Sequence, residues 1–126
     1  MLKSLNPQQV KAVEHYMGSA LVVAGPGSGK TRVLTHRVAN LILKHNVSES
    51  NILCVTFTNK ASNEIKTRVG KLLAGKASLP WSGTFHSICA RILRKDGKYI
   101  GIPPGYTIYD TDDQESKGLL YQCAKI

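Results

Sequence analysis

The sequence has few acidic residues, few cysteines and few aromatic residues, and it contains no long apolar run. Its 126 residues include eight Asp or Glu against 17 Lys or Arg, which gives a formal net charge of +9. No stretch approaches the roughly 20 apolar residues of a membrane-spanning helix, and the first residues lack the pattern of a secretory signal peptide. We therefore expect no membrane partner and a cytoplasmic location.

The three cysteines are too few and too widely spaced for a zinc site or a disulfide framework. Cys54 lies within an apolar run, and Cys89 falls on the apolar face of an expected helix. We expect these two and Cys123 to be reduced and mostly buried thiols.

The basic residues are concentrated in the first three quarters of the chain. Residues 1–95 carry 14 Lys or Arg and three Asp or Glu, whereas residues 96–126 carry three and five. A strongly basic segment favours a polyanionic partner, of which nucleic acid is the obvious example. The alternative is a soluble surface that is simply basic.

The residues from Leu21 to Thr31 form the most informative stretch of the chain. An apolar, β-branched run predicts a buried strand over about Ala20–Ala24, and a glycine-rich turn separates it from a helix that begins near Lys30. The spacing is that of a phosphate-binding loop, with Ala24 in place of the usual first glycine. Glycines allow successive backbone N–H groups to point into one concavity that can hold a nucleotide phosphate. The alternative is a flexible glycine loop between a strand and a helix.

Two side chains that follow the glycines supply the chemistry that phosphate binding requires. Lys30 can neutralise phosphate charge and the Thr31 hydroxyl can ligate Mg²⁺, while the N-terminal end of the helix adds positive potential. These two are the expected catalytic residues, and Thr31 is the expected metal ligand. The nucleotide contacts expected from this stretch are Ala24, Gly25, Pro26, Gly27, Ser28, Gly29, Lys30, Thr31 and Arg32.

Alternating helix and strand patterns predict an α/β fold with a parallel sheet and right-handed crossovers. The expected elements are a helix over 7–17 capped by Asn6, a strand over 20–24, a helix over 30–45, a strand over 52–57, a helix from Thr58 and Asn59 to about 73, a strand over 81–84 and a helix that buries Phe85, Cys89, Ile92 and Leu93. Beyond Lys95 a Gly- and Pro-rich linker leads to a last helix, capped from Asp110 onward, whose apolar stripe is left uncovered. That stripe suggests a truncated piece of a longer protein.

Polar residues follow each of the three expected strands, and parallel strands present their carboxyl ends at one edge of a sheet. Hydroxyl, amide and lysine side chains suit phosphate oxygens, and an exposed Phe57 could stack on a base. The alternative is that Thr58 and Asn59 only cap a helix and both phenylalanines are core; for Phe85 we favour the core. The nucleic-acid contacts expected at this edge are Thr56, Phe57, Thr58, Asn59, Lys60, Thr84, His86 and Ser87.

Two further residues fit a nucleotide base. Arg37 lies seven residues after Lys30, nearly on the same helix face and about 10 Å further along, where its guanidinium could stack on a flat ring. A solvated surface arginine is the alternative. Gln9 could offer its amide edge to a purine.

Together these stretches resemble the start of a UvrD/PcrA/Rep-type superfamily one DNA helicase. The resemblance rests on Leu5-Asn6-Pro7-Gln8-Gln9, Ala24–Thr31 continuing to Arg37, Thr56-Phe57-Thr58-Asn59-Lys60-Ala61 with Glu64 and Arg68, and Gly83-Thr84-Phe85-His86-Ser87, and covers essentially the whole chain. It implies that residues 1–95 are part of a RecA-like P-loop NTPase domain and that residues 96–126 begin an inserted helical subdomain. It also implies that ATP and Mg²⁺ are the cofactors and that hydrolysis drives 3′→5′ movement on single-stranded or 3′-tailed duplex DNA, together with the remaining helicase domains.

The resemblance also assigns roles to individual residues. Gln9 would read adenine, Arg37 would pack against the adenine ring, and the Thr56–Lys60 and Gly83–Ser87 motifs would contact single-stranded DNA. Ser62 stands where the family usually has Ala, a difference that we expect to be silent.

The family's Asp-Glu motif and the arginine-bearing second RecA-like domain have no match in this sequence. Because phosphoryl transfer needs such groups, we expect the isolated chain to bind nucleotide weakly and hydrolyse it negligibly. Asp110 ends a strand-like run, but no Glu follows it and a helix cap is the better interpretation. Two alternatives stay open: a nucleotide- and DNA-binding module without turnover, and another P-loop enzyme such as a nucleoside kinase. A GTPase is excluded because Asn59-Lys60-Ala61-Ser62 lacks the Asp that guanine recognition needs.

Overall fold

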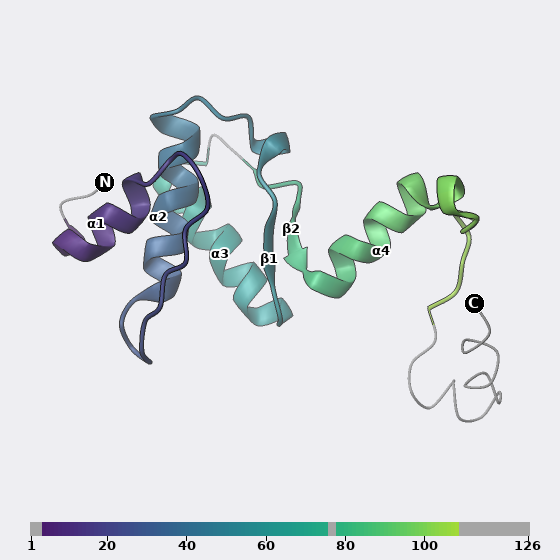
Figure 1. The fold of residues 1–126 in the computed structure, drawn as a ribbon, viewed down its shortest axis with the longest axis horizontal. Coiled ribbons are helices and arrows are strands. Elements are labelled where there is room, and N and C mark those ends of the chain that lie inside the picture. The colour runs from purple at the N-terminus through teal and green to yellow at the C-terminus, as the bar shows by residue number, and fades with distance from the viewer. Residues whose placement is uncertain (1–3, 76–77, 109–126) are drawn as a thin grey trace. The chain divides into compact units, whose positions relative to one another are not determined.

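The computed structural model describes residues 4–75 and 78–108 (Figure 1). The chain consists of two compact units. Residues 1–88 form the first unit and residues 89–126 the second. The expected last helix, its cap at Asp110 and Cys123 lie outside the described residues. Within those residues, no helix is both long and apolar enough to cross a membrane.

The first unit is a small mixed α/β structure. In chain order it contains α1 (Pro7–Glu14), α2 (Lys30–Leu43), a short 3₁₀ turn η2 (Glu49–Asn51), β1 (Cys54–Thr56), α3 (Asn59–Leu72) and β2 (Ser82–Thr84), and α4 (Phe85–Asp96) begins in it. The two strands pair in parallel, with Cys54 opposite Ser82 and Thr56 opposite Thr84. The prediction of a parallel α/β arrangement is confirmed at this level.

The core of this unit lies between α2, α3 and the sheet. Ile65, Val69 and Leu73 are buried at the i, i+4, i+8 spacing that the sequence predicts, and they pack with Val38 of α2 and with Cys54 of β1. Burial raises the pKa of the Cys54 thiol, and the neighbouring Ser82 hydroxyl acts more weakly in the opposite direction. The expectation of a buried, reduced thiol is therefore confirmed for Cys54.

The expected strand over residues 20–24 is absent, which corrects the sequence-based prediction. The segment is an irregular connection between α1 and α2 (Figure 1), and Leu21 and Val23 are 90% and 88% exposed. A strand needs a neighbour to accept and donate its backbone hydrogen bonds. The described strands pair with each other instead, and no described segment pairs with residues 20–24.

Two helices also differ from expectation. Helix α1 ends at Glu14 rather than near Met17, which is exposed. On α4, Phe85, Cys89 and Ile92 are exposed, so the predicted apolar face is wrong and Cys89 is not a buried thiol. The buried residues of this helix are Ile88 and Ala90. Ile88 is held inward by its close packing on the bare backbone of Gly83, where an added Cβ would lie 3.3 Å from the Ile88 side chain.

The second unit continues α4 and then turns through η3 (Gly97–Ile100). Gly101 ends η3 with a left-handed φ of 79°, a conformation that glycine adopts without steric cost. The Tyr106 hydroxyl donates a hydrogen bond to the Ala90 carbonyl oxygen over 3.0 Å, and the Arg94 guanidinium lies 5.8 Å from the centre of the Tyr106 ring. These contacts fasten the linker back onto the helix that precedes it.

Candidate functional site

The glycine-rich loop before α2 is tightly curled. Gly27 and Gly29 have φ values of 74° and 83°, which only glycine adopts without strain. The Gly25 carbonyl oxygen accepts hydrogen bonds from the Ser28 hydroxyl at 2.6 Å and from the Lys30 ammonium at 2.7 Å. Lys30 also donates to the Ala24 carbonyl oxygen at 3.1 Å, so its charge is held over the loop. The loop is therefore a closed turn rather than an extended linker.

The loop ends at the N-terminus of the 14-residue helix α2, which has no side-chain cap. Gly29 occupies the cap position, and the first backbone N–H groups of a helix have no partner within the helix. Uncapped N–H groups, the positive end of the helix and Lys30 together form an environment that suits an anion. The loop can therefore hold a phosphate group.

Arg68 of α3 extends this cationic environment, and sequence reasoning did not identify it as a site residue. It lines a cavity of about 360 Å³ together with Gly27, Gly29, Lys30, Thr31 and Arg32. Its guanidinium is paired with the Glu64 carboxylate at 2.6 Å. The i, i+4 spacing of this pair is visible in the sequence, but its nearness to the loop depends on how α3 packs.

Gln9 of α1 is brought to the same loop. Its side-chain Oε1 accepts the Asn6 backbone N–H at 3.1 Å, and the Asn6 side chain accepts the Gln9 backbone N–H at 2.9 Å. The Gln9 Nε2 donates to the Ser28 carbonyl oxygen at 3.0 Å. A Cβ at position 29 would lie 3.0 Å from this Nε2, so the close contact needs the glycine.

Arg37 of α2 is bound to the C-terminal end of α1, which contradicts the alternative of a solvated surface arginine. One guanidinium nitrogen, Nη1, donates to the Ala12 carbonyl oxygen at 2.8 Å and to the His15 carbonyl oxygen. Guanidinium N–H groups donate in the plane of the group, so these bonds leave its faces available to a flat ring.

A cavity of about 1100 Å³ brings these groups together. Its wall includes Gln9, Lys30, Thr31 and Arg37, as well as the connection over residues 20–24. This volume is slightly above the range of about 300–1,000 Å³ that is usual for ligand pockets in proteins. Thr56, Phe57 and Thr58 also line it, so the glycine loop and the segment after β1 lie on one cavity, whereas residues 83–87 are not among its lining residues.

The segments after the two strands carry a pair of exposed aromatic rings. Phe57 is 89% exposed and Phe85 44% exposed, which overturns the expectation that Phe85 is a core residue. Their ring centres are 5.2 Å apart, with planes inclined by 41°. The paired ends of β1 and β2 bring the rings together, because Thr56 lies directly opposite Thr84.

Some polar residues at this edge make local hydrogen bonds, and others are exposed. The Thr58 hydroxyl caps α3 by accepting the Ala61 N–H at 3.2 Å, and the Thr84 hydroxyl accepts the Ser87 N–H at 3.2 Å and donates to the Ser87 hydroxyl oxygen at 3.1 Å. The capping role expected for Thr58 is therefore confirmed. Asn59, Lys60 and His86 are exposed.

The comparison with known families agrees with this arrangement. A model of the UvrD/REP helicase N-terminal domain matches residues 5–125. The chain belongs to this family. The UvrD/REP match covers the glycine loop, α1 with Gln9, and the segments after both strands.

Individual UvrD/REP-type proteins are similar over nearly the same length. The chain is 51% identical over 116 residues to the ATP-dependent DNA helicases PcrA of Staphylococcus aureus and Staphylococcus epidermidis. The matched region is 92% of this chain but 16% of each relative. The chain therefore spans about a sixth of the length of the curated relatives that it matches.

Proposed function

We propose that this chain is the N-terminal ATP-binding portion of an ATP-dependent 3′→5′ DNA helicase that moves on single-stranded DNA. The observation that carries the proposal is the shared cavity, in which a phosphate-type loop, Gln9 and Arg37 meet the segment after β1. The names of the PcrA relatives support the same activity. Residues 1–95 would belong to a RecA-like domain and residues 96–126 to an inserted subdomain, within a cytoplasmic protein.

The site fits ATP with Mg²⁺ by its geometry and its donors. A Cβ at Gly25 or Gly27 would meet no atom within 4 Å, so there is open space above the loop. Lys30 would exchange its loop carbonyls for phosphate oxygens, the α2 N–H groups would bind the β-phosphate, and Thr31 would hold Mg²⁺. When bound, Mg²⁺ neutralises developing charge on the phosphates. Arg37 would lie against the adenine ring and Gln9 would meet its edge.

The aromatic pair would form the start of a path for single-stranded DNA. Phe57 would stack on a base, and Lys60, Asn59, His86 and the threonine hydroxyls would contact phosphates and sugars. Phe85 would support Phe57 through their ring contact. Affinity for DNA should fall steeply with salt, because it depends on neutralising backbone phosphates.

A second candidate is a nucleotide- and DNA-binding module without turnover. One feature favours it for the isolated chain: the described carboxylates are Glu14, Glu49, Glu64 and Asp96, and no two of them are adjacent in the sequence. An Asp-Glu pair of the kind that holds Mg²⁺ and orients the attacking water would then come from another part of a longer protein.

Steady-state ATP hydrolysis with and without single-stranded DNA tests both candidates. A full-length protein that carries this chain should show DNA-stimulated turnover that Lys30→Ala abolishes, while the 126-residue chain should bind ATP and turn it over negligibly. Turnover by the isolated chain well above its Lys30→Ala variant would reject the expected inactivity. Phosphate transfer to a nucleoside, with no response to DNA, would replace the helicase proposal with a kinase.

A further inference from the structure

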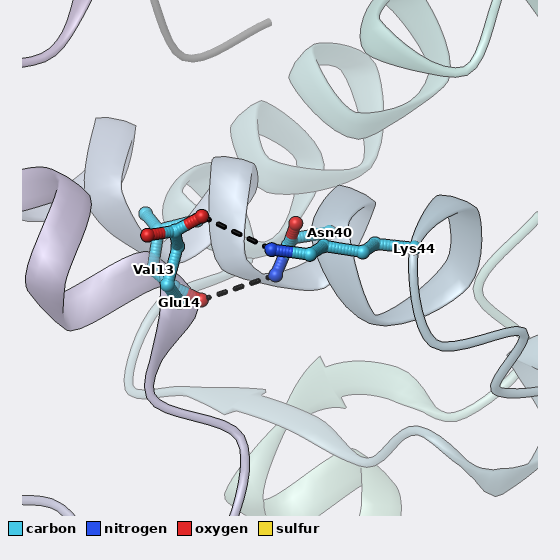
Figure 2. A network of polar contacts seen from close by, with 4 residues as sticks. All are labelled: Val13, Glu14, Asn40 and Lys44. Atoms are coloured by element: carbon cyan, nitrogen blue, oxygen red, sulfur yellow. Dashed lines mark hydrogen bonds and ion pairs between the residues drawn. The ribbon is translucent and has the colours of Figure 1, made fainter.

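Three polar side chains on one face of α2 bind the C-terminal end of α1. Arg37 donates to the Ala12 and His15 carbonyl oxygens, Asn40 donates from Nδ2 to the Val13 carbonyl oxygen at 3.4 Å, and Lys44 pairs with Glu14 at 3.1 Å. Figure 2 shows Asn40 and Lys44 reaching side by side from α2 toward Val13 and Glu14. The spacing of three and four residues places the three donors along one side of the helix.

Asn40, the middle one of these three donors, is buried. It is 3% exposed and Val13 is 2% exposed, so water cannot replace the hydrogen bond between them. The last carbonyl groups of a helix have no partner within the helix and need one from elsewhere. Because α1 stops at Glu14, the amide of Asn40 supplies that partner to a carbonyl group in the interior.

The three donors on α2 are important for the position of α1, because α1 is short. Isolated helices of eight residues are not stable in water, so the placement of α1 depends on its contacts with the rest of the unit. One end of α1 is held by Asn40 and its neighbours, and the other end carries Gln9, whose amide reaches Ser28 of the loop. Loosening the first end would therefore move Gln9 relative to the loop.

We propose that Asn40 is a positioning residue for the base-binding side of the nucleotide site. It acts through α1, which it holds so that Gln9 and the Arg37 guanidinium meet a purine in fixed geometry. This inference rests on the proposed function, since it assumes that adenine lies between those two residues. The Lys44–Glu14 pair contributes less, because both side chains are about half exposed and such pairs add little.

The test compares the affinity of the 126-residue chain for ATP with its affinity for inorganic tripolyphosphate, which has the phosphates and no base. Asn40→Leu has the same number and branching of side-chain heavy atoms and lacks the donor. We expect it to bind ATP about fivefold more weakly and to bind tripolyphosphate as the unsubstituted chain does. Asn40→Asp, which places a carboxylate against the Val13 carbonyl group, should bind ATP at least as weakly.

The matched control is Thr35→Val on the same helix. Thr35 is as buried as Asn40, but its hydroxyl donates to the Arg32 carbonyl oxygen within α2 and does not reach α1. This variant should keep the ratio of ATP affinity to tripolyphosphate affinity. Lys30→Ala should weaken both ligands together, because it acts on the phosphates.

The experiment distinguishes a failure of the proposed function from a failure of the role proposed for Asn40. If the unsubstituted chain binds ATP no more tightly than tripolyphosphate, the base-binding part of the proposed function is wrong and the role of Asn40 falls with it. If ATP gains from its base and Asn40→Leu keeps that gain, only the role of Asn40 is overturned. An equal loss of both ligands in the Asn40 variants would show a merely structural role and would also overturn it.

Discussion

The side-chain Nε2 of Gln9 donates a hydrogen bond to the Ser28 carbonyl oxygen over 3.0 Å, which ties the first helix to the glycine loop. The other end of the same amide accepts the Asn6 N–H at 3.1 Å. Turning the amide over would break both bonds, so the positions of its donor and acceptor are fixed. An amide in fixed orientation can distinguish the edge of adenine, with a donor and an acceptor, from that of guanine.

Replacing Gln9 by Glu should reduce the preference for ATP over GTP. The carboxylate keeps an acceptor for the Asn6 N–H but has no donor for Ser28, and it presents two acceptors to the base. We expect the ratio of ATP to GTP affinity to fall about tenfold, as measured by competition against a fluorescent ATP analogue. Asn63→Asp adds the same charge at an exposed position of α3 that does not line this cavity, and it should leave the ratio unchanged. An unaltered ratio in Gln9→Glu would remove Gln9 from base recognition.

Phe57→Ala should weaken binding to a short oligothymidylate. A stacked base contributes about 1–3 kcal/mol by alanine substitution, so an effect of tenfold or more is expected for this 89% exposed ring. Phe57→Trp should restore affinity, because a larger ring still stacks. Fluorescence anisotropy of the labelled oligonucleotide at several salt concentrations measures the affinity of each variant and the salt dependence of that affinity.

The slope of that salt dependence separates stacking from phosphate contact. Phe57→Ala should shift the affinity without changing the slope, whereas Lys60→Ala should make the slope shallower by about one. A slope that changes with Phe57, or an affinity insensitive to salt in the unsubstituted chain, would contradict the proposed DNA surface.

Local signals explain which elements the sequence predicts well. The Asn6 cap, the α2 helix after the glycines and the Thr58 cap of α3 each depend on residues within four positions of one another. The loop itself is also local, because the left-handed conformations of Gly27 and Gly29 follow from their lack of a Cβ.

Features that depend on distant partners are the ones that sequence reasoning missed. Residues 20–24 have the composition of a buried strand, but strand formation requires a hydrogen-bonding neighbour that no described segment provides. Phe85 fits a helical stripe, yet the abrupt turn from β2 into α4 directs Ile88 inward and leaves Phe85 beside Phe57. Arg68 reaches the loop only because α3 packs next to α2.

The two described thiols should react at very different rates with a neutral disulfide reagent. Cys89 is exposed, whereas Cys54 is buried and burial raises its pKa above the ordinary value of 9.0. In a Cys123→Ser background at pH 8, we expect one fast thiol that Cys89→Ser removes and one slow thiol that Cys54→Ser removes. Equal rates for the two would contradict the burial of Cys54.

The same shift gives a pH dependence of stability with a definite sign. Because the folded state favours the neutral Cys54 thiol, its contribution is present below pH 9 and is lost as the pH rises through the raised folded pKa. The free energy of unfolding, measured with urea, should change less between pH 8 and pH 10 in Cys54→Ala than in the unsubstituted chain.

Arg68→Ala should weaken the binding of ATP more than that of AMP. The guanidinium lines the cavity beside Lys30 and Thr31, where the outer phosphates of a nucleotide would lie. It is half exposed and paired with Glu64 in an i, i+4 contact, whose loss costs a helix only about 0.3–0.5 kcal/mol, so the fold should survive. We expect an approximately fivefold loss for ATP and none for AMP, measured by calorimetry.

Two variants decide whether the Arg68 effect is specific. Lys66→Ala removes a positive charge from the same helix at a position that does not line this cavity, and it should leave the ATP to AMP ratio unchanged. Arg68→Lys keeps the charge but loses the planar fork of donors. Its ratio of ATP to AMP affinity should lie between those of the unsubstituted chain and Arg68→Ala. An equal effect of Lys66→Ala and Arg68→Ala would reduce the role of Arg68 to long-range charge, because contact with a phosphate requires the residue that lines the cavity.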